Sequence, residues 1–292
     1  MLDYIFGFLI IYSFFDRLKF FINKRKIGKV PIMKGAEPVY NEGGKTGLLM
    51  IHGFSSSPGE LKYLINHFKK KGYTVSAPLM KGHGTIPEDL YVTNWEDWVK
   101  SVEDSLKELS REVNQIYIIG SSLGGNIALH LMSSNIRAKK YKVKGIVTLS
   151  TPINFRRSRI IKTLLPVFKL IKHQQRKIFL GRRDRKATKN KAHYQVIPLR
   201  SLSQVIEFIK IVKEKMHLVK VPILVMNSDT DYQITLDNCY YIFSNVSSDY
   251  REKYILHNAY HVFVHDSNPY VRRTAFKKIE SFIDKLENFY YE

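Results

Sequence analysis

Short apolar runs alternate with amphipathic stretches along this 292-residue chain from residue 47 onward. Apolar runs of this kind are typical of strands in a buried parallel sheet, and the amphipathic stretches between them are typical of crossover helices. The predicted strands cover residues 48–51, 73–78, 115–120, 143–149, 222–227 and 253–256. The pattern therefore predicts an α/β protein with one doubly wound, mostly parallel sheet.

The amphipathic stretches predict helices at residues 58–71, 94–113 and 123–132, another from residue 235, and a closing helix over 268–289. Between the strands that end at residue 150 and begin at residue 221, the chain is basic and helical in character, with no obvious strand. We interpret residues 153–217 as a helical cap, inserted into an α/β core made of residues 30–152 and 218–292.

The N-terminal residues 1–29 have a different character from the core. Residues 4–15 are uncharged and largely apolar, and basic residues follow them, including Lys24, Arg25 and Lys26. Twelve helical residues reach about 18 Å, which is less than the roughly 30 Å of bilayer hydrocarbon. No basic residue precedes the run and no small-residue cleavage site follows it, so a signal peptide is disfavoured. We predict an interfacial or marginally spanning anchor on the cytoplasmic face of a membrane; the alternative is a first helix packed on the domain.

The formal net charge of +21 is concentrated in two segments. Residues 153–217 hold 18 Lys and Arg against 3 acidic residues, and residues 1–35 hold 7 against 2. Such surfaces attract polyanions, which include anionic lipid headgroups and nucleic acid. No nucleic-acid motif accompanies the charge, so we expect an anionic membrane surface as partner and disfavour nucleic acid. A simply solvated basic surface is the alternative.

The chain has a single cysteine, Cys239, so it can form no intramolecular disulfide and has no Cys/His cluster with zinc spacing. Its place in an apolar run predicts a buried structural thiol. This cysteine usage is typical of a cytoplasmic chain.

A Gly-x-Ser-x-Gly pattern, residues 120–124, lies between a predicted strand and a predicted helix. A sharp strand-to-helix turn needs small neighbours to hold its serine in a strained conformation, which is the role we assign to Gly120 and Gly124. The helix that follows presents its positive end to developing negative charge. Ser122 is therefore the predicted nucleophile.

A serine nucleophile needs a histidine base that is oriented by a carboxylate. In this kind of fold the acid and then the histidine follow the nucleophile along the chain, at the ends of later strands. The candidate bases are therefore His257, His261 and His265, and we favour His261 because it lies in the connecting loop. Asp231 is the predicted acid, with Asp229 in reserve as the residue closer to the strand end.

The oxyanion of an acyl-transfer reaction requires preorganised N–H donors. Leu123, which follows the nucleophile, supplies one predicted donor, and Phe54, in the loop after the first central strand, supplies the other. Gly53 lets the backbone approach the substrate, and His52 is interpreted as a buried residue that braces the loop. Residues 82–84 (Gly-His-Gly) predict a tight turn and no metal site, since no second ligand stands at useful spacing.

With these residues in place, the chain resembles the bacterial carboxylesterase and monoacylglycerol lipase-like branch of the α/β-hydrolase family. The resemblance covers residues 47–289 and is carried by residues 49–55, 81–84, 120–125, 231–234 and 261–262. It implies the α/β-hydrolase fold and hydrolysis of short or medium acyl esters or of monoacylglycerol, with Ser122, Asp231 and His261 as triad. It implies no cofactor and no metal.

Two departures from the family leave the substrate open: residues before Val30 have no counterpart in soluble members, and the cap is far more basic. Lysophospholipase and thioesterase activity are the alternatives within enzymes. A lipid- or nucleic-acid-binding module on a hydrolase fold, without turnover, is the alternative from another class. The sequence does not determine the oligomeric state.

Overall fold

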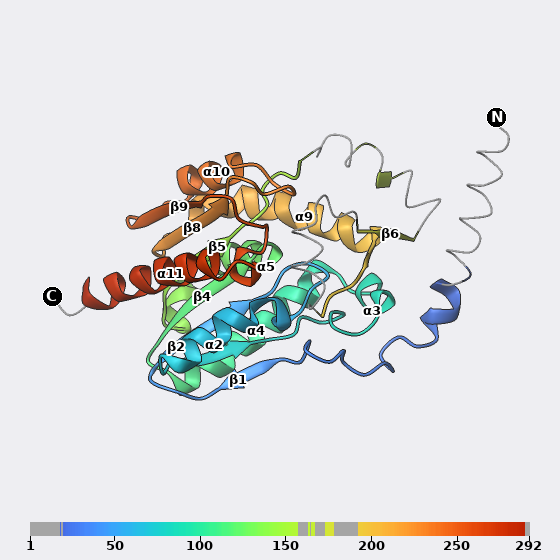
Figure 1. Cartoon of the computed structure of the whole chain (residues 1–292), viewed down its shortest axis with the longest axis horizontal. Coiled ribbons are helices and arrows are strands. Elements are labelled where there is room, and N and C mark those ends of the chain that lie inside the picture. The colour runs from blue at the N-terminus through green and yellow to red at the C-terminus, as the bar shows by residue number, and fades with distance from the viewer. Residues whose placement is uncertain are drawn as a thin grey trace.

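One seven-stranded sheet forms the centre of the described structure, with strand order β1-β3-β2-β4-β5-β8-β9 (Figure 1). The computed structural model describes residue 18 and residues 20–156, 163, 165–166, 173–177 and 192–289. The strands are β1 (Val39–Asn41), β2 (Thr46–Ile51), β3 (Thr74–Ala77), β4 (Gln115–Ser121), β5 (Val143–Leu149), β8 (Ile223–Ser228) and β9 (Arg251–Leu256). All neighbours pair in parallel except β1, which runs antiparallel to β3. The predicted doubly wound, mostly parallel sheet is confirmed, with β1 as an unpredicted addition.

Helices cover both faces of this sheet, because its strands carry apolar side chains on both sides. One face packs against η1 (Pro58–Leu61), α2 (Lys62–Lys70) and α11 (Pro269–Phe289). The other face packs against α4 (Trp95–Glu112), α5 (Leu123–Met132), α9 (Leu199–Lys215) and α10 (Asp237–Asn245). Alternate residues of β2 pack into the hydrophobic cores on opposite faces of the sheet. Leu48 faces α2 and α11, whereas Leu49 faces α4 and α5.

Shorter elements complete the described chain: α3 (Pro87–Tyr91), α6 (Asn135–Lys140), η2 (Met216–Leu218) and η3 (Phe263–His265). Cys239 is buried in α10, as predicted, and burial raises the pKa of its thiol to about 11. This thiol therefore stays protonated and packs as an apolar group.

The expectation of a cap without strands is wrong. Within the predicted cap, β6 (Gln174–Arg176) pairs antiparallel with β7 (Val196–Pro198). β6 has the sequence Gln-Gln-Arg, which lacks the apolar alternation of a half-buried strand, so only its pairing partner reveals it. Much of the predicted cap, including the basic residues 178–191, lies outside the described residues.

Most of the predicted N-terminal anchor, residues 1–17 and 19, also lies outside the described residues. Phe20 is buried, and its ring contacts the rings of Tyr91 in α3 and His173 next to β6, with centroids 4.5 and 4.6 Å away. In the described part of the chain, every helix is too short or too polar to cross a bilayer.

Candidate active site

Ser122 occupies the turn between β4 and α5 with a strained backbone, φ 51° and ψ −115°. A residue with a side chain rarely adopts a positive φ, so the surrounding structure must hold Ser122 in this backbone conformation. The Ser122 N–H donates to the Leu149 carbonyl at 2.8 Å. A Cβ on Gly120 would stand 2.3 Å from the Gly124 carbonyl oxygen, and one on Gly124 would stand 2.3 Å from the Ile51 carbonyl oxygen. Only glycine fits at these two positions, so the turn has the geometry of a nucleophile elbow.

Asp231 and His261 form a buried pair, with Asp231 Oδ2 and His261 Nδ1 2.5 Å apart. Their side chains are 0% and 3% exposed. Asp231 Oδ1 accepts backbone N–H groups from Gln233 at 2.8 Å and Ile234 at 3.3 Å. Burial opposes ionisation of Asp231, but the His261 charge and these hydrogen bonds outweigh it and hold the pKa of the carboxyl below its usual value. The acid is therefore ionised and fixed beside the imidazole.

The other ring nitrogen of His261, Nε2, is buried and has no hydrogen-bond partner among the described residues. The contact with Asp231 fixes Nδ1 as the protonated nitrogen, which leaves Nε2 as a lone-pair acceptor. An imidazole with one nitrogen held by a buried carboxylate and the other unpaired is suited to general base catalysis.

The reserve residues are placed differently. Asp229 Oδ2 lies 2.7 Å from His257 Nδ1, and the Asn258 N–H donates to Asp229 Oδ1 at 2.8 Å. The His257 side chain is 84% exposed, so this second carboxylate–histidine pair lies in water. His265 is buried, and its Nδ1 contacts the Glu60 carbonyl at 3.1 Å. His261 is therefore the candidate that lies in the interior in direct contact with a buried carboxylate.

The loop after β2 runs directly beside the elbow. A Cβ on Gly53 would lie 3.3 Å from Ser122 Cβ, which shows how closely the two segments approach. Among the hydrogen bonds of the described residues, none uses the backbone N–H of Phe54 or of Leu123. Two unpaired N–H groups, one on each side of the serine, are available to a developing oxyanion.

His52 braces this loop from inside the core. Its Nε2 accepts the Met80 N–H at 3.2 Å, so its Nδ1 carries the proton and donates to the Gly53 carbonyl at 2.9 Å. Burial lowers the pKa of His52, against the opposing charge of Glu60. His52 is therefore a neutral connector between the loop and the exit of β3.

His83 packs edge-on to His52, with ring centroids 5.1 Å apart, in a turn where Gly82 and Gly84 have positive φ. Burial and the neighbouring His52 lower the pKa of His83 well below its usual value. Its ring also contacts the Phe54 and Trp98 rings. Across the described ranges, no three His, Cys, Asp or Glu side chains are grouped to hold a metal ion.

Sequence reasoning missed Glu60 as a site residue. Its buried carboxylate accepts the Gly53 N–H at 2.6 Å and thereby fixes the His52–Gly53 peptide, one residue before Phe54. In the sequence, an acidic residue after Pro-Gly in a first helical turn indicates only a favourable helix start. Sequence reasoning also missed Tyr194, from the cap, whose N–H donates to the Ser55 carbonyl at 3.0 Å.

Comparisons with known proteins identify the family of this chain. The family described as serine aminopeptidase S33 (Hydrolase_4) matches residues 45–268. A protein from Bacillus sp. (strain H-257), named thermostable monoacylglycerol lipase, is 31% identical over 80% of this chain and 89% of its own length. A Bacillus subtilis (strain 168) protein named carboxylesterase is 25% identical over 86% of this chain and 97% of its own.

Among solved structures, one reported with the metagenome-derived lipolytic enzymes LipS and LipT has a TM-score of 0.77 at 23% identity. The match covers 87% of this chain and 100% of that one, and it shows the shared fold. The chain therefore belongs to the serine aminopeptidase S33 (Hydrolase_4) family and is a serine hydrolase of the esterase and lipase type with the α/β-hydrolase fold.

Proposed function

We propose that this protein hydrolyses carboxylic esters through a triad of Ser122, His261 and Asp231. The observation that carries the proposal is the buried 2.5 Å pair of Asp231 and His261, whose Nε2 is unpaired among the described residues. The three residues follow β4, β8 and β9, whose parallel strands end at one edge of the sheet. That edge is where α/β proteins build their sites.

The proposed reaction has two half-reactions. His261 takes the proton of Ser122 as the serine oxygen attacks the ester carbonyl, and the N–H groups of Phe54 and Leu123 stabilise the oxyanion. His261 then protonates the leaving alcohol, which leaves an acyl-enzyme. Water attacks this acyl group with His261 again as base, and the acid and the serine are released. Asp231 remains ionised throughout and orients the imidazole.

The proposed substrates are short or medium acyl esters and monoacylglycerols. The relatives named monoacylglycerol lipase and carboxylesterase, which match over most of this chain, support this class. Thioesters and lysophospholipids contain an acyl carbonyl that the same machinery could attack, so they are the alternatives. A substrate panel separates these classes by kcat/KM.

The decisive test compares Ser122→Ala with Ser121→Ala on p-nitrophenyl esters, monoacylglycerols, lysophospholipids and acyl-CoA. Ser121 is the adjacent buried serine, so it controls for general damage to the turn. We expect Ser122→Ala to lose roughly a thousand-fold or more in kcat and all fluorophosphonate labelling, with Ser121→Ala close to wild type. Full activity or labelling in Ser122→Ala would refute the triad. Absence of turnover in the wild type would favour a binding module.

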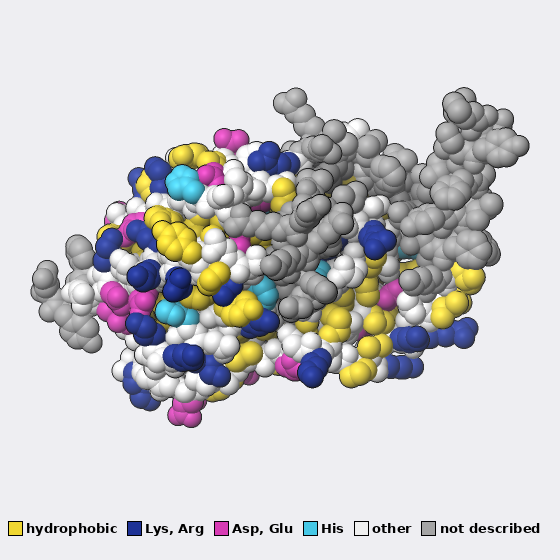
Figure 2. Space-filling model, in the orientation of Figure 1, with side chains coloured by type: hydrophobic (Ala, Val, Ile, Leu, Met, Phe, Trp, Pro, Cys, Tyr) yellow, Lys and Arg dark blue, Asp and Glu magenta, His cyan; other side chains and the backbone are white. Residues whose placement is uncertain are grey.

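We further propose that residues 20–29 contact an anionic membrane at its cytoplasmic face. Phe21 and Ile22 are 61% and 53% exposed, and the basic residues Lys24, Arg25 and Lys26 follow them. Figure 2 shows hydrophobic and basic side chains together at the edge of the molecule where this segment lies. Exposed apolar side chains beside cations fit an interface of acyl chains and anionic headgroups.

Residues of α3 connect this segment to the cap, which supports that placement. The buried Glu88 carboxylate accepts side-chain amides from Asn23 at 3.1 Å and from Gln174 in β6 at 2.9 Å. The same segment donates the Gly28 N–H to Asp89 at 2.8 Å. A membrane bound at residues 20–29 would therefore lie next to the cap.

Vesicle flotation tests the membrane proposal. We expect the full chain to float with anionic vesicles at low salt and to be released by high salt, because the attraction is screened. Changing Lys24, Arg25 and Lys26 to Gln should weaken flotation, whereas the matched change of Lys100, Lys107 and Arg111 on α4 should not. Equal flotation with zwitterionic vesicles at low salt would contradict the proposal.

A further inference from the structure

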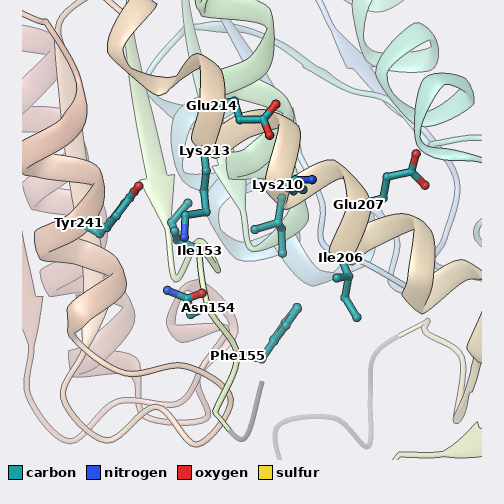
Figure 3. A pocket seen from close by; sticks show the side chains of 10 residues that line it. Ile153, Asn154, Phe155, Ile206, Glu207, Lys210, Lys213, Glu214 and Tyr241 are labelled. Atoms are coloured by element: carbon teal, nitrogen blue, oxygen red, sulfur yellow. The ribbon is translucent and has the colours of Figure 1, made fainter. Parts of the chain in front are cut away.

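A cavity of about 590 Å³ lies beside the loop that holds Asp231, between α9, α10 and residues 153–155 (Figure 3). Its size is within the range typical of small-molecule sites. Its walls include Ile153, Asn154, Phe155, Ile206, Lys213 and Tyr241, and none of the proposed triad residues. It is therefore a separate site from the proposed catalytic centre.

The cavity has a lysine and an amide at one end and apolar side chains at the other, and a second lysine, Lys210, also lines it from α9. Lys213 extends from α9 toward Ile153 and Asn154, and Phe155 and Ile206 lie at the other end (Figure 3). The Lys213 Nζ lies 4.9 Å from the Tyr241 ring centroid, and no carboxylate of the described residues forms an ion pair with it. The polar end therefore offers an uncompensated cation and an amide.

Two carboxylates also line the cavity, Glu207 and Glu214 of α9. In Figure 3 both point away from the end where Lys213 and Asn154 lie. The ligand that fits must therefore place one anionic group at Lys213 and an apolar chain along Phe155 and Ile206. Charge-assisted hydrogen bonds favour a carboxylate at the cation, and burial favours an alkyl chain at the apolar end.

We propose that this cavity binds a free fatty acid, with its carboxylate at Lys213 and Asn154. The inference rests on the proposed function in one respect, because a fatty acid is the product of the proposed reaction.

The cavity wall is joined to the loop that carries Asp231. Phe155 forms a β-bridge with Ile234, and the Arg156 N–H donates to the Gln233 carbonyl at 3.0 Å.

These contacts couple the cavity to the active site, so a fatty acid bound in the cavity can affect the position of Asp231. The N–H groups of Gln233 and Ile234 are the same two donors that hold Asp231 Oδ1. On the other side, the N–H groups of Ile153 and Asn154 donate to Asn238 Oδ1, each at 2.6 Å. A ligand that fixes residues 153–156 therefore biases the position of the loop carrying the catalytic acid, so accumulating product regulates its own formation.

Photoaffinity labelling of the full wild-type chain tests the binding site without requiring turnover. The probe is a medium-chain fatty acid with a diazirine near its alkyl terminus, used below its micelle concentration. We expect label on the tryptic peptides 145–156 and 201–210, which carry Phe155 and Ile206. Excess laurate should remove that label. The matching diazirine alcohol, which lacks the carboxylate, should label these peptides about ten-fold less.

Lys213→Met keeps the length of the side chain and removes its charge, so it should reduce this labelling about ten-fold. Lys100→Met on α4 is the matched control and should label as wild type. Equal labelling by acid and alcohol, or by wild type and Lys213→Met, would overturn the proposal, as would label confined to other peptides.

Turnover provides the regulatory readout. Added laurate should change wild-type ester turnover more than that of Lys213→Met, and equal effects would overturn the regulatory role. A wild type without any turnover would refute the proposed function and leave the labelling result to decide the site.

Discussion

Asp231 and Asp229 lie two residues apart, yet each holds a different histidine in a different environment. Asp231 pairs with His261 at 2.5 Å in the protein interior, and Asp229 pairs with His257 at 2.7 Å. The His261 side chain is 3% exposed and that of His257 is 84% exposed. Electrostatic interaction is much stronger away from water, so the buried pair holds its imidazole in place more firmly than the exposed pair does.

Asp231→Asn should lower kcat for ester hydrolysis by roughly ten-thousand-fold, because an amide does not stabilise the imidazolium or its working tautomer. Asp229→Asn is the matched control, since it removes the same charge two residues away. We expect it to retain wild-type kcat within about two-fold. Steady-state kinetics at saturating p-nitrophenyl ester measures both. Equal losses of kcat in the two variants would contradict the assignment of Asp231 as the catalytic acid.

Glu60 links the loop after β2 to η1, which follows it. Glu60→Leu leaves the buried Gly53 N–H without its acceptor, which should cost about 1–3 kcal/mol of unfolding free energy and lower kcat more than it raises KM. Glu60→Gln retains an acceptor oxygen, so it should keep most of the wild-type unfolding free energy and most of the wild-type kcat. Urea denaturation and steady-state kinetics test this pair, and a Leu variant with unchanged kcat would show that the loop needs no such support.

Gly125 in α5 packs directly against Thr151, which lies two residues after the end of β5. A Cβ on Gly125 would stand 1.8 Å from Thr151 Oγ1 and 2.9 Å from its Cβ. Gly125→Ala should therefore destabilise the fold by about 1–3 kcal/mol through overpacking. The double variant with Thr151→Ala should recover at least about 1 kcal/mol, because Oγ1 is gone. If thermal denaturation shows that the effects of Gly125→Ala and Thr151→Ala on stability simply add, then α5 relieves the clash by moving and the predicted contact with Oγ1 is not its cause.

Glu252 on β9 should make stability depend on pH. Partial burial opposes its ionisation, but hydrogen bonds from Lys278, Tyr250 and Lys285 outweigh burial and lower the pKa of Glu252 to about 2. A depressed folded-state pKa gives stability that is present above the unfolded value of 4.5 and is lost as pH falls toward 2.

Glu252→Gln should therefore lower the unfolding free energy by up to about 1 kcal/mol at pH 7, since the carboxylate is partly exposed. The difference from wild type should shrink as pH falls below 4.5. Asp104→Asn, which breaks the exposed Lys100–Asp104 pair, is the control and should change little. Thermal denaturation across pH measures both variants, and a constant difference down to pH 3 would contradict the linkage.

The sequence predicted the inner strands β2, β3, β4, β5 and β8 well because they are buried on both faces and therefore appear as largely apolar runs. β5 and α5 have the predicted bounds. β1, β6 and β7 escaped prediction because each has only three residues, too few to show a pattern of their own, so pairing with a neighbour makes them strands.

For the candidate site, the sequence by itself determined the residue types and their order along the chain: a serine between small neighbours, then an aspartate, then a histidine. It favoured Asp231 over Asp229 only by position in the loop, since both follow the same strand. Tertiary structure adds a physical difference between them, because burial and the contact of Asp231 with His261 depend on how β8 and β9 lie side by side. It alone also revealed Glu60 beneath the oxyanion loop and the cavity beside the acid loop, since both join segments that are distant in sequence or packed from different elements.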